Sequence, residues 1–190
     1  GLQTGNRVLL RSANQPMLVA CWVAVMLAGG IAVGTMPMLR AHELRQIIDK
    51  AQISHALCDG ALADELALAA ADSPWLRELR HFGAAAPQGG LSLEALAAAR
   101  PAHFTAVDTA AEDIALLAFT SGTTGVPKAT MHSHRDLMAA CACFPPHVLR
   151  AGADDLFIGS PPRPKVKASG GLVLFPLCVG DELVDEIARG

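Results

Sequence analysis

An uncharged run over residues 12–39 constrains the fold more than any other feature, because it contains no Asp, Glu, Lys or Arg. Its length would suffice for a membrane span, which needs about 20 apolar residues. Pro16 and Pro37 bracket the run, however, and the pair Gly29 and Gly30 divides it. A helix over residues 17–28 would be about 18 Å long, too short for roughly 30 Å of hydrocarbon. The run therefore predicts a buried helix–turn–strand unit and no membrane span.

The ends of this unit follow from its residue types. Asn14 is the expected N-cap, and Pro16 suits the first helical turn, where a missing N–H costs nothing. Gly29 is typical of the position just past a helix end. Residues 31–35, Ile-Ala-Val-Gly-Thr, predict a short buried strand.

Strands and helices alternate on both sides of this unit. We expect strands at 7–12, 55–58 and 114–119, an amphipathic helix at 42–51, and an Ala-rich helix at about 61–71. Residues 72–112 are less regular and predict a surface connection with one helix near 91–99. A further helix is expected to start near Ser133. This alternation predicts an α/β fold built on a mainly parallel sheet with helical crossovers.

Composition excludes several classes of function. The 15 basic and 18 acidic side chains give a net charge of −3, which disfavours binding to a nucleic-acid backbone. Aromatic residues make up only 4% of the chain, so a base-stacking surface is not expected.

The five cysteines and seven histidines suggest neither disulfides nor metal. The cysteine count is odd and there is no C-x-x-C pair, so we expect reduced thiols and a cytoplasmic protein. Cys141 and Cys143 are two residues apart, which would point them in different directions on a helix. His42-Glu43 begins like a zinc-binding H-E-x-x-H motif, but residue 46 is Gln, so no metal ligands are predicted.

The segment that carries most chemical information is Thr120-Ser-Gly-Thr-Thr-Gly-Val-Pro-Lys128, directly after the apolar strand at 114–119. A Gly-, Ser- and Thr-rich loop at the end of a strand offers backbone N–H groups and hydroxyls without bulky side chains, which suits a polyphosphate. Lys128 adds a compact positive charge.

Two other interpretations of this loop are weaker. A polar hairpin-like turn would need neither four hydroxyls nor the Pro-Lys pair. A P-loop of the type G-x-x-x-x-G-K-[ST] agrees in the spacing of Gly122 and Lys128, but Pro127 replaces the second glycine and Ala129 replaces the Ser or Thr that binds magnesium.

The loop resembles the phosphate-binding signature of the adenylate-forming superfamily, which includes acyl- and aryl-CoA ligases, luciferases and peptide-synthetase adenylation domains. Residues 26–33 are similar to a K-A-G-G segment of that family, with Leu27 in place of Lys. Residues 133–137, Ser-His-Arg-Asp-Leu, resemble the T-H-R-N-L that follows the loop. Residues 160–162 and 170–177 resemble the approach to the acyl pocket. Residues 141–148 look most like benzoate- and 2-aminobenzoate-CoA ligases.

The resemblance implies a reaction in two steps. A carboxylic acid attacks the α-phosphate of ATP, carried as its Mg²⁺ complex, to give an acyl-adenylate and pyrophosphate; coenzyme A then displaces AMP. It also implies the phosphate-binding residues, which are Thr120, Ser121, Gly122, Thr123, Thr124, Gly125 and Lys128. Lys128 would stabilise the leaving pyrophosphate. His134 matches the histidine after the loop and would lie near the nucleotide, or else simply start the helix.

The resemblance further implies that residues 1–190 are an incomplete piece of the large N-terminal domain, without the small C-terminal domain. Alone, the piece is expected to be inactive and to self-associate through surfaces that the rest of the enzyme would cover. The alternatives are a non-catalytic nucleotide- or anion-binding module, or a scaffold that keeps an idle loop. Residues 163–169 and 181–190 depart from the family pattern, so no acyl-site residues are assigned there.

Overall fold

The computed structural model describes residues 1–83, 92–120, 127–152 and 154–155. They form a six-stranded sheet in the order β4-β3-β1-β2-β5-β6, in which only the last pair is antiparallel. In chain order the elements are β1 (Arg7–Arg11), α1 (Pro16–Leu27), β2 (Ile31–Thr35), α2 (Ala41–Ala51), β3 (His55–Asp59), a 3₁₀ turn (Gly60–Leu62), α3 (Ala63–Ala70), β4 (Glu78–Phe82), α4 (Leu93–Ala98), β5 (Ile114–Thr120), β6 (Lys128–Ser133), α5 (His134–Phe144) and a π-helical turn (Pro145–Leu149). The predicted mainly parallel α/β fold is confirmed.

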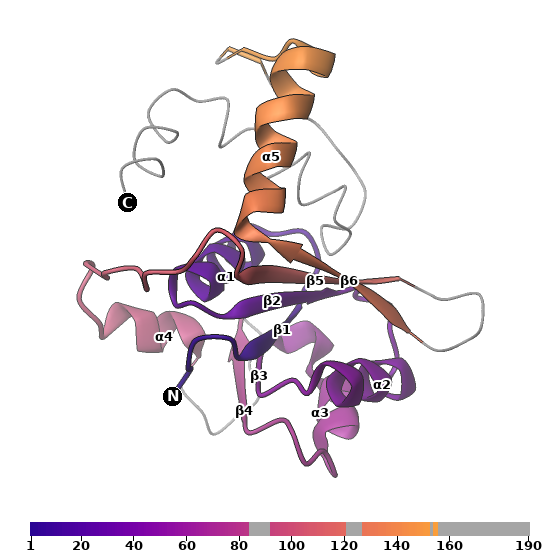
Figure 1. Ribbon diagram of the computed structural model, residues 1–190. Helices are drawn as coiled ribbons and strands as arrows, with labels where there is room; N and C mark the ends of the chain where they lie inside the picture. Colours follow the sequence, from indigo (N-terminus) through magenta and orange to yellow (C-terminus); the bar gives the residue numbers. More distant parts are fainter. Residues whose placement is uncertain (84–91, 121–126, 153, 156–190) are drawn as a thin grey trace.

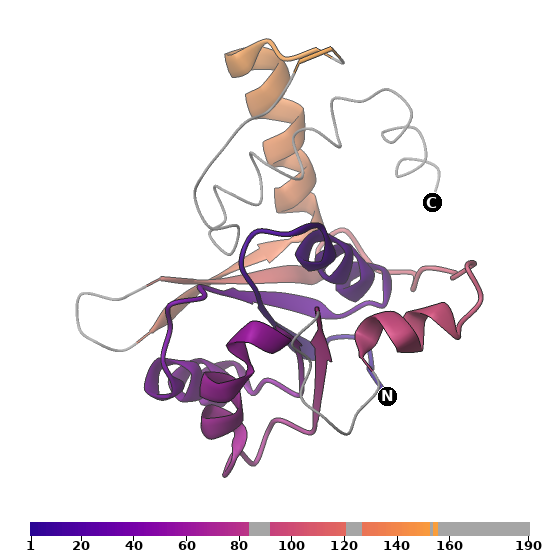
Figure 2. The same cartoon turned by 180° about the vertical axis from the view of Figure 1, so that it is seen from behind.

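Helices cover both faces of the sheet (Figure 1). On one face, α1 and α4 pack over a core that includes Leu10, Trp22 and Phe82. On the other, α2 and α3 pack over Leu9, Leu44 and Leu66. Both views show α5 standing away from the sheet (Figures 1 and 2).

Several predicted elements agree closely with the structure. The strand Ile31–Thr35 has the expected bounds. The apolar stripe of α2 is buried as its spacing predicted. On α5, Cys141 is buried and Cys143 exposed, as expected for positions two residues apart. In the described part of the chain, no helix is long and apolar enough to span a membrane.

Three features differ from expectation. The N-cap of α1 is Gln15 and not Asn14, and no side chain caps the helix. Glu78–Phe82 forms the edge strand β4, where an irregular connection was expected; it pairs in parallel with β3 along its whole length. The polar residues Lys128–Ser133 form β6. Edge strands expose one side to solvent, so both lack the apolar run that marks an interior strand.

Arg11, at the end of β1, is a charged side chain inside the fold with an exposed fraction of 1%. Its guanidinium donates hydrogen bonds to four backbone carbonyl oxygens, those of Leu62, Met36, Pro37 and Leu39, over 2.9–3.2 Å. Burial lowers the pKa of Arg11. The side chain fastens the β2–α2 loop and the start of α3 to the end of β1.

Candidate functional site

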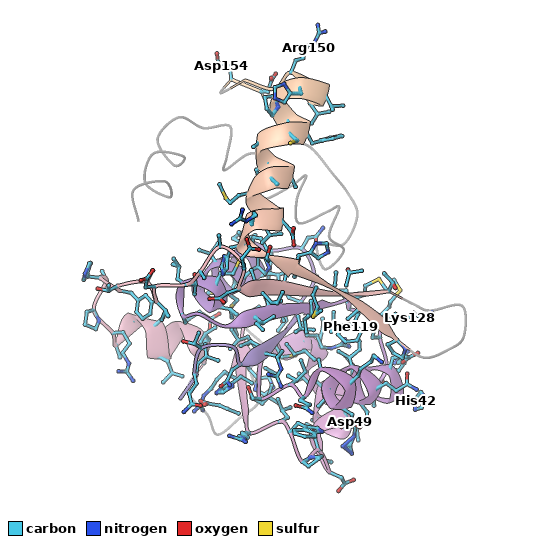
Figure 3. The ribbon with its side chains drawn as sticks, in the orientation of Figure 1. His42, Asp49, Phe119, Lys128, Arg150 and Asp154 are labelled. Atoms are coloured by element: carbon cyan, nitrogen blue, oxygen red, sulfur yellow. The ribbon has the colours of Figure 1, made fainter. Side chains whose placement is uncertain are left out.

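The Gly-, Ser- and Thr-rich segment connects β5 to β6. These strands are antiparallel, and Thr120, the last residue of β5, pairs directly with Lys128, the first residue of β6. Paired residues of antiparallel strands have Cα atoms about 4.5–5.5 Å apart. The two ends of the segment are therefore held together, and Figure 3 shows Lys128 and Phe119 at this end of the hairpin.

This arrangement separates the site from a P-loop of the G-x-x-x-x-G-K-[ST] type, in which the loop leads into a helix. Here an antiparallel strand follows the loop. The segment is thus a hairpin connection, and a hairpin tip can still direct N–H groups and hydroxyls towards an anion.

Two of the predicted phosphate-binding residues, Thr120 and Lys128, lie in the described part of the chain, and both are exposed. The other predicted ligands, Ser121, Gly122, Thr123, Thr124 and Gly125, lie outside the described residues. The structure therefore brings together the first and last residues of the predicted site.

His134 lies at the opposite end of β6 from the loop. It is the first residue of α5, and its backbone N–H donates to the carbonyl oxygen of Asp113 at 3.1 Å. Strands rise about 3.4 Å per residue, so six residues place His134 about 20 Å from Lys128. The fold does not bring these two predicted residues together, and a role for His134 near the nucleotide stays a prediction.

The start of α5 is strongly capped, as the predicted helix start at Ser133 requires. The hydroxyl of Ser133 accepts from the backbone N–H of Asp136 at 3.2 Å, and the Asp136 carboxylate accepts from the backbone N–H of Ser133 at 2.8 Å. This capping box lowers the pKa of Asp136. Arg135 ties the same turn to the start of β5 through an ion pair with Glu112 at 2.6 Å.

Two residues of β6 that sequence reasoning did not select connect this capped end with the loop. Thr130 pairs with Ala118, and its hydroxyl lies 3.4 Å from the Ala118 carbonyl oxygen. The Nε2 atom of His132 lies 3.2 Å from the same hydroxyl. The sequence contained one signal for these residues, the two-residue spacing of Lys128, Thr130 and His132. This spacing places them on one face only if residues 128–133 form a strand.

A hollow of about 370 Å³ lies at the end of the sheet where β1, β2 and β3 finish. The β5–β6 loop starts at the same end, because β5 runs parallel to β2. The hollow is lined by Arg11, Pro37, Met38, Leu39, Arg40, Ala61, Leu62, Asp64 and Glu65. Its two cations already have partners, because Arg11 is bonded to carbonyls and Arg40 pairs with Glu65 at 2.9 Å. Glu65 also accepts from the backbone N–H of Ala41, at the N-terminus of α2. Between these two features, the β5–β6 loop is the better candidate for binding phosphate.

Metal binding has no support from the described residues, since no group of three His, Cys, Asp or Glu side chains among them could hold an ion.

Comparison with known proteins gives concordant results. The family described as AMP-binding enzyme matches residues 1–184. The 3-hydroxybenzoate–CoA ligase of Aromatoleum sp. (strain CIB) is 33% identical over 144 residues, covering 74% of this chain and 27% of that protein. The anthranilate–CoA ligase of Pseudomonas aeruginosa is 29% identical over 185 residues, covering 92% of this chain and 33% of that protein.

Solved structures share the fold. The anthranilate CoA ligase AuaEII in complex with anthranoyl-AMP superimposes with a TM-score of 0.90 at 24% identity, covering 94% of this chain and 35% of that one. ATP-bound MatB from Rhodopseudomonas palustris superimposes with a TM-score of 0.78 at 26% identity, covering 100% of this chain and 39% of that one. The chain thus spans about a quarter to a third of the length of these curated relatives.

Proposed function

The chain belongs to the AMP-binding enzyme family, and we propose that it is part of an acid–thiol ligase that activates a carboxylic acid with ATP and transfers the acyl group to coenzyme A. The observation that carries this proposal is the family match over residues 1–184, which includes the β5–β6 hairpin and its loop. Relatives named as ligases of 3-hydroxybenzoate and anthranilate favour an aromatic acid as the substrate.

The chemistry of the loop supports this proposal. Adenylation brings a carboxylate towards a polyanion, and negative charge grows on pyrophosphate as it leaves. Fixed hydroxyls, backbone N–H groups and a lysine stabilise such charge without reorganising. We assign phosphate binding to Thr120, Lys128 and the residues between them, with Lys128 acting on the leaving pyrophosphate. Mg²⁺ would arrive bound to ATP, and no residue is assigned to it.

The extent of the chain bears on its own activity. It spans about a quarter to a third of its curated relatives, so we propose that residues 1–190 form part of a larger N-terminal domain. We propose that the remaining part of such a protein contributes groups around the adenine, the acid and the metal. We expect the 190-residue chain alone to show no ATP–pyrophosphate exchange with benzoate, 2-aminobenzoate or 3-hydroxybenzoate.

Exchange in a full-length enzyme carrying this chain tests the proposal. If Lys128 stabilises developing charge, Lys128→Ala should lower kcat about 10²–10³-fold, and more than it raises KM for ATP. Thr123→Val should cost less, because neighbouring donors remain. Lys50→Ala, the same change at an exposed lysine of α2, is the matched control and should leave both constants unchanged.

The outcomes separate mechanism from binding. If Lys128→Ala changed only KM, Lys128 would bind ATP equally well in the ground state and the transition state, and it would have no role in the chemical step. ATP binding without exchange by the full-length enzyme would favour a non-catalytic nucleotide-binding module. A full-length enzyme that neither bound ATP nor catalysed ATP–pyrophosphate exchange would refute the proposed function.

A further inference from the structure

Thr130 and His132 lie on the same face of β6 as Lys128, because alternate residues of a strand point to the same side. The contact between the Thr130 hydroxyl and His132 Nε2 at 3.2 Å agrees with this placement. In the described part of the sheet, β6 pairs only with β5 and forms its edge. The position of Lys128 therefore depends on how well β6 is held to this one neighbour.

The Thr130 hydroxyl has two polar neighbours. It donates to the Ala118 carbonyl oxygen at 3.4 Å, because a carbonyl oxygen can only accept. His132 Nε2 lies 3.2 Å from the same hydroxyl, and it donates to that hydroxyl when Nε2 carries a proton. The three groups form a relay from His132 through Thr130 to the backbone of β5.

The relay lies between two fixed points. The pair Thr130 and Ala118 is two residues from the pair Thr120 and Lys128, at which the loop leaves the hairpin, or about 7 Å along the strand. At its other end, His132 is close enough to the capping carboxylate of Asp136 for its charge to lower the pKa of that group, after the larger effect of the hydrogen bonds from Ser133. The relay thus joins the start of α5 to the stem of the loop.

We propose that Thr130 and His132 are positioning residues of the phosphate site. They hold β6 against β5 so that Lys128 stays opposite Thr120 when ATP binds. This inference rests on the proposed function, since it requires the loop to bind phosphate. A neutral hydrogen bond contributes a net stabilisation that corresponds to about a threefold to tenfold change in an equilibrium constant, so a loss of ATP affinity of that size is expected.

The test is titration of ATP into a full-length enzyme carrying this chain and into four variants of that enzyme. Thr130→Val keeps the shape and removes the hydroxyl, and His132→Phe keeps a ring and removes both nitrogens; each should weaken ATP binding about threefold to tenfold. Thr130→Ser keeps the hydroxyl, and His132→Gln keeps a terminal N–H donor. Both variants should keep most of the affinity for ATP. Thr105→Val, at an exposed threonine outside the sheet, is the matched control.

The double variant Thr130→Val/His132→Phe gives an independent measure. If both residues act through one relay, the double variant should lose no more affinity than the weaker-binding single variant, because the effects of one network are not additive. Melting temperatures, measured in parallel, show that each variant is folded at the titration temperature.

The results distinguish this inference from the function on which it rests. If the wild-type enzyme binds ATP and Lys128→Ala weakens this binding, but Thr130→Val and His132→Phe bind ATP like wild type, the positioning role is overturned and the phosphate site remains. Equal losses in Thr130→Ser and Thr130→Val would also overturn it, since packing would then explain the effect. If the wild-type full-length enzyme does not bind ATP, the proposed function fails and the inference fails with it.

Discussion

Replacing Arg11 with methionine should destabilise the fold more than any other removal of a single charge described above. The substitution keeps most of the apolar stem and removes the group that donates to the carbonyl oxygens of Leu62, Met36, Pro37 and Leu39. At about 1 kcal/mol net for each of four hydrogen bonds, the loss in free energy of unfolding is about 4 kcal/mol. Domains of this kind are stable by only about 5–15 kcal/mol, so the loss is large.

Urea unfolding followed by far-UV circular dichroism would measure this loss. Arg11→Lys keeps a charge but has three donors on one atom, so it cannot reach carbonyls on several sides and should lose about half as much. Arg40→Met is the control, because its side chain is 77% exposed and makes one ion pair with Glu65; exposed pairs contribute about 0–1 kcal/mol. A loss below about 1 kcal/mol for Arg11→Met, or an equal loss for Arg40→Met, would refute this account of Arg11.

Three further results are expected. Cys143 is exposed, whereas burial raises the pKa of the Cys58 thiol to about 12. In a disulfide-exchange assay of the native chain, Cys143→Ser should therefore show one fast-reacting thiol fewer than wild type, and Cys58→Ser should show no such loss. Hydrogen bonds from Ser133, first of all from its backbone N–H, depress the pKa of Asp136, so the stability they supply is present above the unfolded pKa of about 3.9 and is lost as pH falls through the folded pKa. The melting temperature of Asp136→Asn should therefore fall below that of wild type at pH 7, and the gap should narrow as pH falls below the unfolded pKa. The exposed apolar side chains of β6 and α5, such as Met131 at 69% exposure, should make the chain self-associate, and light scattering that showed Met131→Lys to be as associated as wild type would contradict this.

Elements with strong local patterns could be predicted from the sequence. The stripe of Leu44, Ile47, Ile48 and Ala51 on α2 is local and periodic, and the structure buries all four. The strand Glu78–Phe82 has no such pattern, because only Phe82 among its five residues is fully buried and its identity as a strand comes from pairing with β3. Sequence periodicity reports burial, so a strand at the edge of a sheet gives a weak signal.

The candidate site divides in the same way. The composition of the loop at 120–128 and its position after an apolar strand are local facts, and they were sufficient to select it. The contribution of Thr130 and His132 depends on the pairing of β6 with β5, which is tertiary information. Burial of Arg11 was also out of reach, because its acceptors lie 25 to 51 residues further along the chain.

The long sequence separations bridged by Arg11 also bear on the order of folding. The β5–β6 hairpin joins neighbouring residues, and hairpins of this kind form within about 1–10 μs. The bonds of Arg11 cannot form until three strands and the start of α3 have come together, since they connect β1 to positions as distant as Leu62. We therefore expect Arg11 to act after the rate-limiting barrier, so that its loss accelerates unfolding and leaves the folding rate nearly unchanged. A side chain of this kind determines how long the native state lasts once it has formed.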